Sequence, residues 1–239
     1  MEGQSTCLNC GTALTARWCP VCGQDGERRL HSLPTVLART LESVVDFDGR
    51  VASTLRRLIA HPGRLTREYA QGHFVGQVDP MRLYLATSAL YFFLAPRIGG
   101  GFIRLAGGDA SGPWFSFGPL GWDSAFLLLL LVPLWALMAR LIIPGRSRYV
   151  EEFFVFSVHY QIVFFLVVGG TGLLAALAVR AGVPWLAPPL LLAGLVILFI
   201  HLLRALRVAF GLQGARLVLA TGALFLLHFG GAQLLQNLM

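Results

Sequence analysis

Four cysteines near the amino terminus are the residues of this chain best suited to chemistry. They form two C-x2-C pairs separated by eight residues, at positions Cys7, Cys10, Cys19 and Cys22. Each pair presents two thiolates on one side of a tight turn, and two facing turns supply the four ligands of a tetrahedral zinc ion. Gly11 and Gly23 follow the second cysteine of each pair, where a glycine permits the positive φ that such a turn needs.

Two disulfides or a redox-active pair are the alternatives for these cysteines. The sequence does not open with a basic segment followed by an apolar one, so we expect no cleavable signal peptide. A disulfide framework requires an oxidising compartment, and a thioredoxin-like pair requires a βαβ setting. The pattern therefore favours a structural zinc ribbon over residues 1–30, closed because four cysteine ligands leave no open position.

The charge balance bears on the partner of this ribbon. The net charge is +7, and the isoelectric point is about 9.9. Residues 1–80 hold nine arginines against eight acidic residues, so they carry no basic stripe of the kind that binds nucleic acid. We therefore expect the ribbon to dock a protein partner, and we do not expect nucleic acid.

The rest of the chain must position the ribbon, and its composition excludes an ordinary soluble domain. Hydrophobic residues make up 56% and charged residues 13%, and no acidic residue follows Glu152. Such depletion of charge is typical of a chain that lies within a bilayer. The sequence predicts an all-α integral membrane protein with about five transmembrane helices in a membrane domain at residues 81–239. The predicted spans are about 81–96, 124–143, 153–179, 185–203 and 215–235.

Arginines in the short connections predict the orientation of these spans. Six flank the connections between spans two and three and between spans four and five, namely Arg140, Arg146, Arg148, Arg204, Arg207 and Arg216. The opposite side has only Arg97, Arg104 and Arg180. This bias predicts a cytoplasmic amino terminus and, with five spans, a carboxyl terminus outside.

Residues 31–80 have the spacing of amphipathic juxtamembrane helices. Apolar residues recur three and four positions apart in two sets, Val36, Leu37, Leu41, Val44 and Val45, then Val51, Leu55, Leu58 and Ile59. Four arginines nearby are candidates for contact with lipid headgroups, namely Arg56, Arg57, Arg64 and Arg67. The alternative is that these helices only pack against the membrane domain.

Histidines within the spans form a second candidate site. His159 and His201 are expected at a similar depth near the cytoplasmic side, with Tyr160 beside the first and His228 deeper. Ionisable residues at such depth indicate metal, haem or proton chemistry, or else simple hydrogen bonds between helices. The predicted spans contain no Asp or Glu, which argues against a carboxylate-based proton relay or an aspartyl protease. No catalytic residue is predicted.

A motif across residues 61–94 carries a family resemblance. The segment HPGRLTREYAQGHFVGQVDPMRLYLATSALYFFL, preceded by the pattern CxxCG…WCxxCGQ, resembles the bacterial membrane-protein family called domain of unknown function 3667. The resemblance implies a ribbon, a PGxLxxxYxxG segment, a proline that opens the first span, and further helices. It also implies the bacterial inner membrane, and it implies no established activity.

The leading functional hypothesis is a non-enzymatic membrane protein. Its ribbon docks a protein partner, and its helical domain binds lipid, a small apolar ligand or another membrane protein. One alternative is a membrane enzyme or redox carrier that uses His159, His201 and His228. Another is a small transporter, because glycines interrupt the long third span between Gly169 and Gly172.

Overall fold

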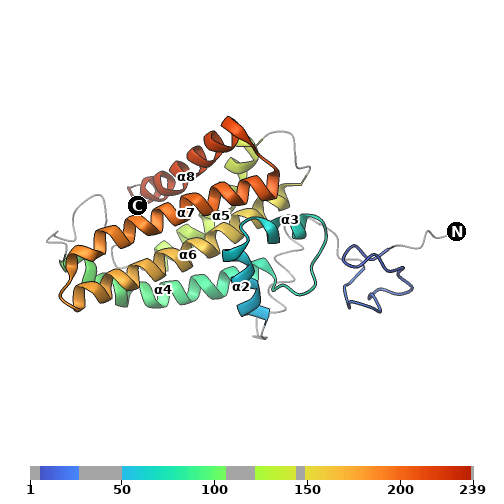
Figure 1. The fold of residues 1–239 in the computed structure, drawn as a ribbon, viewed down its shortest axis with the longest axis horizontal. Helices are drawn as coiled ribbons and strands as arrows, with labels where there is room; N and C mark the ends of the chain where they lie inside the picture. The colour runs from blue at the N-terminus through green and yellow to red at the C-terminus, as the bar shows by residue number, and fades with distance from the viewer. Residues whose placement is uncertain (1–5, 27–49, 106–121, 144–148, 238–239) are drawn as a thin grey trace.

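The computed structural model describes residues 6–26, 50–105, 122–143 and 149–237 (Figure 1). These ranges are mostly helical and contain no strand beyond two isolated bridges inside the cysteine-rich segment. The helices are α2 (Arg50–Ala60), α3 (Arg64–Ala70), α4 (Pro80–Leu105), α5 (Trp122–Ile142), α6 (Val150–Arg180), the 3-10 turn η1 (Pro184–Leu186), α7 (Ala187–Phe210) and α8 (Gly214–Asn237). The predicted helical class is therefore confirmed.

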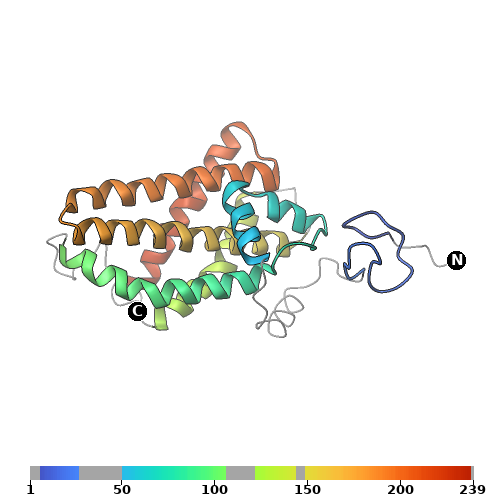
Figure 2. The same ribbon diagram turned by 60° about the horizontal axis from the view of Figure 1, so that its bottom comes forward.

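The long helices form a bundle around α6. Helices α4, α6 and α7 run side by side along the long axis of the molecule, and α6 also contacts α5 (Figures 1 and 2). Every residue from Phe153 to Phe165 is buried, whereas the second half of α6 exposes Leu173, Leu174 and Leu177. The first half of α6 is thus enclosed on all sides, and its second half is covered only in part.

Two stretches of the described chain are long and apolar enough to cross a membrane. They are α6, with a mean hydropathy of 2.5, and Pro184–Phe210, with a mean hydropathy of 2.4. Helices α5 and α8 contain shorter apolar segments, Val132–Ile142 and Gly214–Phe229. On length and composition, the described residues therefore support two of the five predicted spans.

Several helices extend beyond the predicted boundaries. Helix α4 continues through Pro96 to Leu105, although the first span was expected to end at that proline. A proline removes one backbone hydrogen bond and bends a helix, but the helix can continue beyond it. Helix α7 likewise continues to Phe210 because Arg204 and Arg207, which the sequence assigned to a connection, are good helix formers.

Helices α2 and α3 lie across one end of the bundle, with α2 running crosswise to the long helices (Figures 1 and 2). The second apolar set of the sequence falls on α2, where Leu58 is buried and Val51 and Leu55 pack against the core. Ile59, the fourth member of the set, is 52% exposed. The first set, residues 36–45, lies outside the described residues.

Candidate metal centre and buried polar residues

The described part of the ribbon consists of two turns with the same backbone design. The amide of Gly11 donates to Cys7 O at 2.8 Å, and the amide of Gly23 donates to Cys19 O at 2.9 Å. Both glycines have positive φ, 75° and 70°. Each turn therefore closes around its C-x2-C pair in the way that the glycine positions predict, and it directs both sulfurs to the same side.

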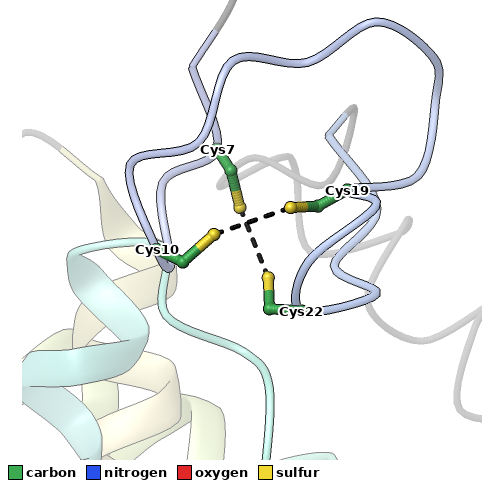
Figure 3. Close-up of side chains that lie close together, drawn as sticks. All are labelled: Cys7, Cys10, Cys19 and Cys22. Carbon is green, nitrogen blue, oxygen red and sulfur yellow. Dashed lines mark hydrogen bonds between the residues drawn. The ribbon is translucent and has the colours of Figure 1, made fainter.

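The two turns face each other and bring all four sulfurs together (Figure 3). The Sγ atoms of Cys7 and Cys22 are 3.6 Å apart, and those of Cys10 and Cys19 are 3.5 Å apart. All four sulfurs lie within 4.8 Å of one another, and no other group of three or more potential ligands gathers in the described chain. Zinc–sulfur bonds of about 2.3 Å in a tetrahedron separate the sulfurs by about 3.8 Å. The cluster therefore has the dimensions of a four-thiolate metal site.

The thiols influence one another's protonation. Hydrogen bonds from the side chain and backbone of Thr12 lower the pKa of Cys10 to about 6. At Cys22 the backbone of Gln24 lowers the pKa, but burial and the three neighbouring thiols outweigh it and raise the pKa to about 11. Four thiolates this close repel one another, so a bound dication is the natural means of holding all four deprotonated.

The ribbon is attached to the helical domain by one buried glutamine. Gln24 Nε2 donates to Gly72 O at 2.9 Å, and Gln24 Oε1 accepts from the amide of Phe74 at 3.2 Å. The side chain of Leu8, from the first turn, lies against Gly72. Sequence reasoning missed this contact, and the only available signal was the glutamine directly after the second glycine.

The two histidines expected at a similar depth each bond to the α2–α3 segment. His159 Nδ1 is 2.9 Å from Thr66 Oγ1, which lies on α3. His201 Nε2 is 3.2 Å from the carbonyl oxygen of Leu58, near the end of α2. Both histidines are buried. The structure therefore joins His159 and His201 to one segment through separate hydrogen bonds.

Tyr160 and His228 form a different group, between α5, α6 and α8. Tyr160 stacks on Trp135 with centroids 5.0 Å apart, and its ring meets that of His228 edge-on at 5.4 Å. The ring centroids of Phe164 and His228 are 4.7 Å apart. The Tyr160 hydroxyl and His228 Nδ1 are buried and have no hydrogen-bond partner among the described residues.

The four candidate headgroup arginines divide into two pairs. Arg57 and Arg64 both form ion pairs with Glu68. Arg56 and Arg67 are exposed. Arg64 is exposed as well despite its ion pair, so of the four arginines only Arg57 is partly buried.

Comparison with known proteins gives one result for this chain. Residues 48–92 match the family described as "Protein of unknown function (DUF3667)". Neither the curated proteins nor the solved structures contain a match to the chain. The matched residues cover α2, α3 and the first half of α4. This segment therefore matches the DUF3667 family of unknown function, which is the family that the sequence resemblance indicated.

Proposed function

We propose that this protein is an integral membrane protein whose amino-terminal ribbon, residues 1–30, binds one structural zinc ion. The observation that carries the proposal is the approach of four thiol sulfurs to within 4.8 Å of one another. Four sulfur ligands in a tetrahedron favour zinc or iron over harder ions. A site with four protein ligands has no open position for a substrate, so its role is to fold the ribbon.

The ribbon is proposed to dock a protein partner. Trp18 is 57% exposed and Val21 is 70% exposed, so the metal-stabilised turns present apolar surface to the solvent. The guanidinium of Arg17 lies over the Trp18 ring, 5.4 Å from its centroid. Aromatic and arginine side chains of this kind are enriched where proteins associate.

The membrane domain is proposed to comprise residues 81–239 and to cross the bilayer five times, with residues 31–80 packed beneath it. Large apolar side chains are exposed on each of α4 to α8, for example Leu90, Leu141, Leu174, Leu192 and Leu226. A helix that exposes such residues gains from contact with lipid. Membrane lipid, a small apolar ligand or another membrane protein is the proposed occupant of this surface.

Orientation and location complete the proposal. The ribbon lies in the cytoplasm, the carboxyl terminus lies outside, and the membrane is the bacterial inner membrane. The arginines that flank the α7–α8 connection support this orientation. The proposed contacts for anionic headgroups are Arg56, Arg57, Arg64 and Arg67, of which all but Arg57 are exposed.

Native mass spectrometry of the full chain ejected from nanodiscs tests the metal and ligand proposals. We expect one zinc ion per chain in the wild type and none in Cys7→Ser. A retained lipid or small molecule would identify the occupant of the membrane domain. A wild-type chain that carries no metal after purification without chelators would refute the zinc proposal.

Labelling of intact cells with a membrane-impermeant maleimide tests the orientation. Ala181→Cys, between α6 and η1, is expected to react on intact cells. Gln213→Cys, between α7 and α8, is expected to react only after permeabilisation. The reverse pattern, or equal reaction of both variants, would contradict the proposed topology.

A membrane enzyme or redox carrier that uses the buried histidines is a second candidate. The observation that favours it is that the Tyr160 hydroxyl and His228 Nδ1 lie in one buried group and find no hydrogen-bond partner among the residues that the structure describes. A haem bound by this group produces a Soret band in the absorbance spectrum of the purified protein, and His228→Phe removes it. A wild-type spectrum without that band excludes haem.

A further inference from the structure

In the contact between the ribbon and the helical domain, one side chain of the ribbon forms hydrogen bonds with the backbone of the loop after α3. Gln24 supplies both a donor, to Gly72 O, and an acceptor, to the amide of Phe74. Its side chain is buried, with 4% of the residue surface exposed. A buried amide with both functions satisfied fixes the orientation of the segment to which it bonds.

The metal site determines where Gln24 lies. Gln24 is two residues from the ligand Cys22, and its carbonyl accepts from the amide of Cys19 at 2.8 Å. The segment is too short to bury a core of its own, so metal binding supplies the free energy that folds it. Without the metal, nothing ties the four sulfurs to one point, so the ribbon loses the constraint that keeps Gln24 at a fixed distance from both partners.

The other side of the contact leads to α6. Phe74 packs edge-on against Tyr69 of α3, with centroids 4.9 Å apart, and both belong to a small buried cluster with Val155 of α6. The Tyr69 hydroxyl donates to Glu151 Oε1 at 3.3 Å. The loop that Gln24 holds is therefore also the loop that places Phe74 against the first turns of α6.

We propose that residues 72–79 form a metal-dependent latch, in which the metal-loaded ribbon holds Phe74 on α6 through Gln24, and loss of the metal releases the loop. The inference rests on the proposed zinc site and extends it, because the ribbon then has a partner within its own chain. In the released state Phe74 leaves the cluster and exposes Tyr69 and Glu151. The metal content of the ribbon thereby changes the surface at this end of the bundle.

Hydrogen–deuterium exchange of the full chain in nanodiscs tests the latch. Five samples are compared: metal-loaded wild type, wild type stripped by a chelator, and the metal-loaded variants Gln24→Ala, Gln24→Glu and Gln71→Ala. Gln71 is an exposed glutamine beside the same loop and is the matched control. The exchange rate of the Phe74 amide measures directly whether the loop is held by the ribbon, because the acceptor of this amide is Gln24 Oε1. Metal content is measured for every sample.

We expect the Phe74 amide to exchange about tenfold faster, or more, in stripped wild type and in Gln24→Ala, since each loses the buried hydrogen bond to Gln24 Oε1. Gln24→Ala keeps one metal per chain, Gln71→Ala exchanges like the wild type, and α6 and α7 stay protected throughout. Gln24→Glu keeps the shape but lacks the donor to Gly72 O, so it exchanges faster than the wild type as well.

Two results separate failure of the latch from failure of the zinc site. If the wild type binds metal but its Phe74 amide stays protected after the metal is stripped, the latch alone is wrong. The same holds if metal-loaded Gln24→Ala exchanges like the wild type. A wild type that never holds metal overturns the zinc site and the metal dependence of the latch together.

Discussion

Replacing Gly63 with alanine is expected to loosen the α2–α3 turn from α7. Gly63 has a φ of +79°, in the left-handed region that side chains disfavour. A Cβ at this position would overlap the carbonyl oxygen of Ala205 and lie 2.9 Å from its Cα. Both atoms belong to the backbone of α7, so no rotamer change relieves the contact.

The cost of Gly63→Ala has two parts. Forcing a Cβ residue into the left-handed conformation costs about 1–2 kcal/mol. Overpacking against a helix backbone adds about 1–3 kcal/mol, which gives a total of about 2–5 kcal/mol. Gly76→Ala separates the two parts, because Gly76 has the same kind of φ, +81°, and a Cβ added to it would meet no atom within 4 Å. Gly76→Ala should therefore lower the free energy of unfolding only by the cost of the left-handed conformation, about 1–2 kcal/mol.

Urea unfolding in detergent micelles, followed by tryptophan fluorescence, measures these free energies. Gly63→Ala is expected to lower the free energy of unfolding by about 1–3 kcal/mol more than Gly76→Ala does. Gly72→Ala, with a φ of +81° and only the flexible side chain of Leu8 nearby, should resemble Gly76→Ala. Equal losses for Gly63→Ala and Gly76→Ala would show that the turn does not pack on α7 as described.

Three further predictions concern other contacts. Gly194→Ala places a Cβ 2.8 Å from Thr171 Oγ1 and should lower the free energy of unfolding by about 1–3 kcal/mol. Adding Thr171→Ala should restore most of this loss, and a double variant as unstable as the single one would exclude the clash. Cys22→Ser should abolish metal binding and make the ribbon sensitive to limited proteolysis while α6 and α7 stay resistant, so a variant whose ribbon resists protease would count against the metal centre. His201→Phe keeps a ring but removes the hydrogen bond to Leu58 O, and should lower the unfolding free energy by about 1–3 kcal/mol; unchanged stability and unchanged hydrogen exchange in α2 would argue against that bond.

The cluster of four cysteines could be predicted because its geometry is local. The spacing of the four cysteines and the two glycines that follow them fix two turns, each closed by a hydrogen bond over four residues. Nothing distant in the chain is needed to bring two thiols of one turn to the same side. The existence of the long helices was equally accessible, since apolar runs of this length have few other structures available.

The attachments between segments were beyond the sequence because they join residues far apart in the chain. Gln24 meets Gly72 across 48 positions, Thr66 meets His159 across 93, and His201 meets Leu58 across 143. Periodicity indicates which residues are buried but not which residues they face. The ion pair between Arg57 and Glu68 shows the same limit, because it becomes evident only once α2 and α3 lie side by side.

The length of α6 gives the family segment a physical role. With 31 residues, α6 is about 46 Å long, which exceeds a hydrocarbon core of about 30 Å by roughly ten residues. Apart from Val150 at its first position, its exposed apolar residues lie in the second half and its buried polar residues in the first. In the proposed membrane domain the excess therefore belongs at the amino-terminal end. There α3 supplies Thr66 to His159, and α2 supplies the carbonyl of Leu58 to His201 of the neighbouring helix. The segment that matches DUF3667 therefore provides hydrogen-bond partners for two histidines that are buried at this end of the bundle.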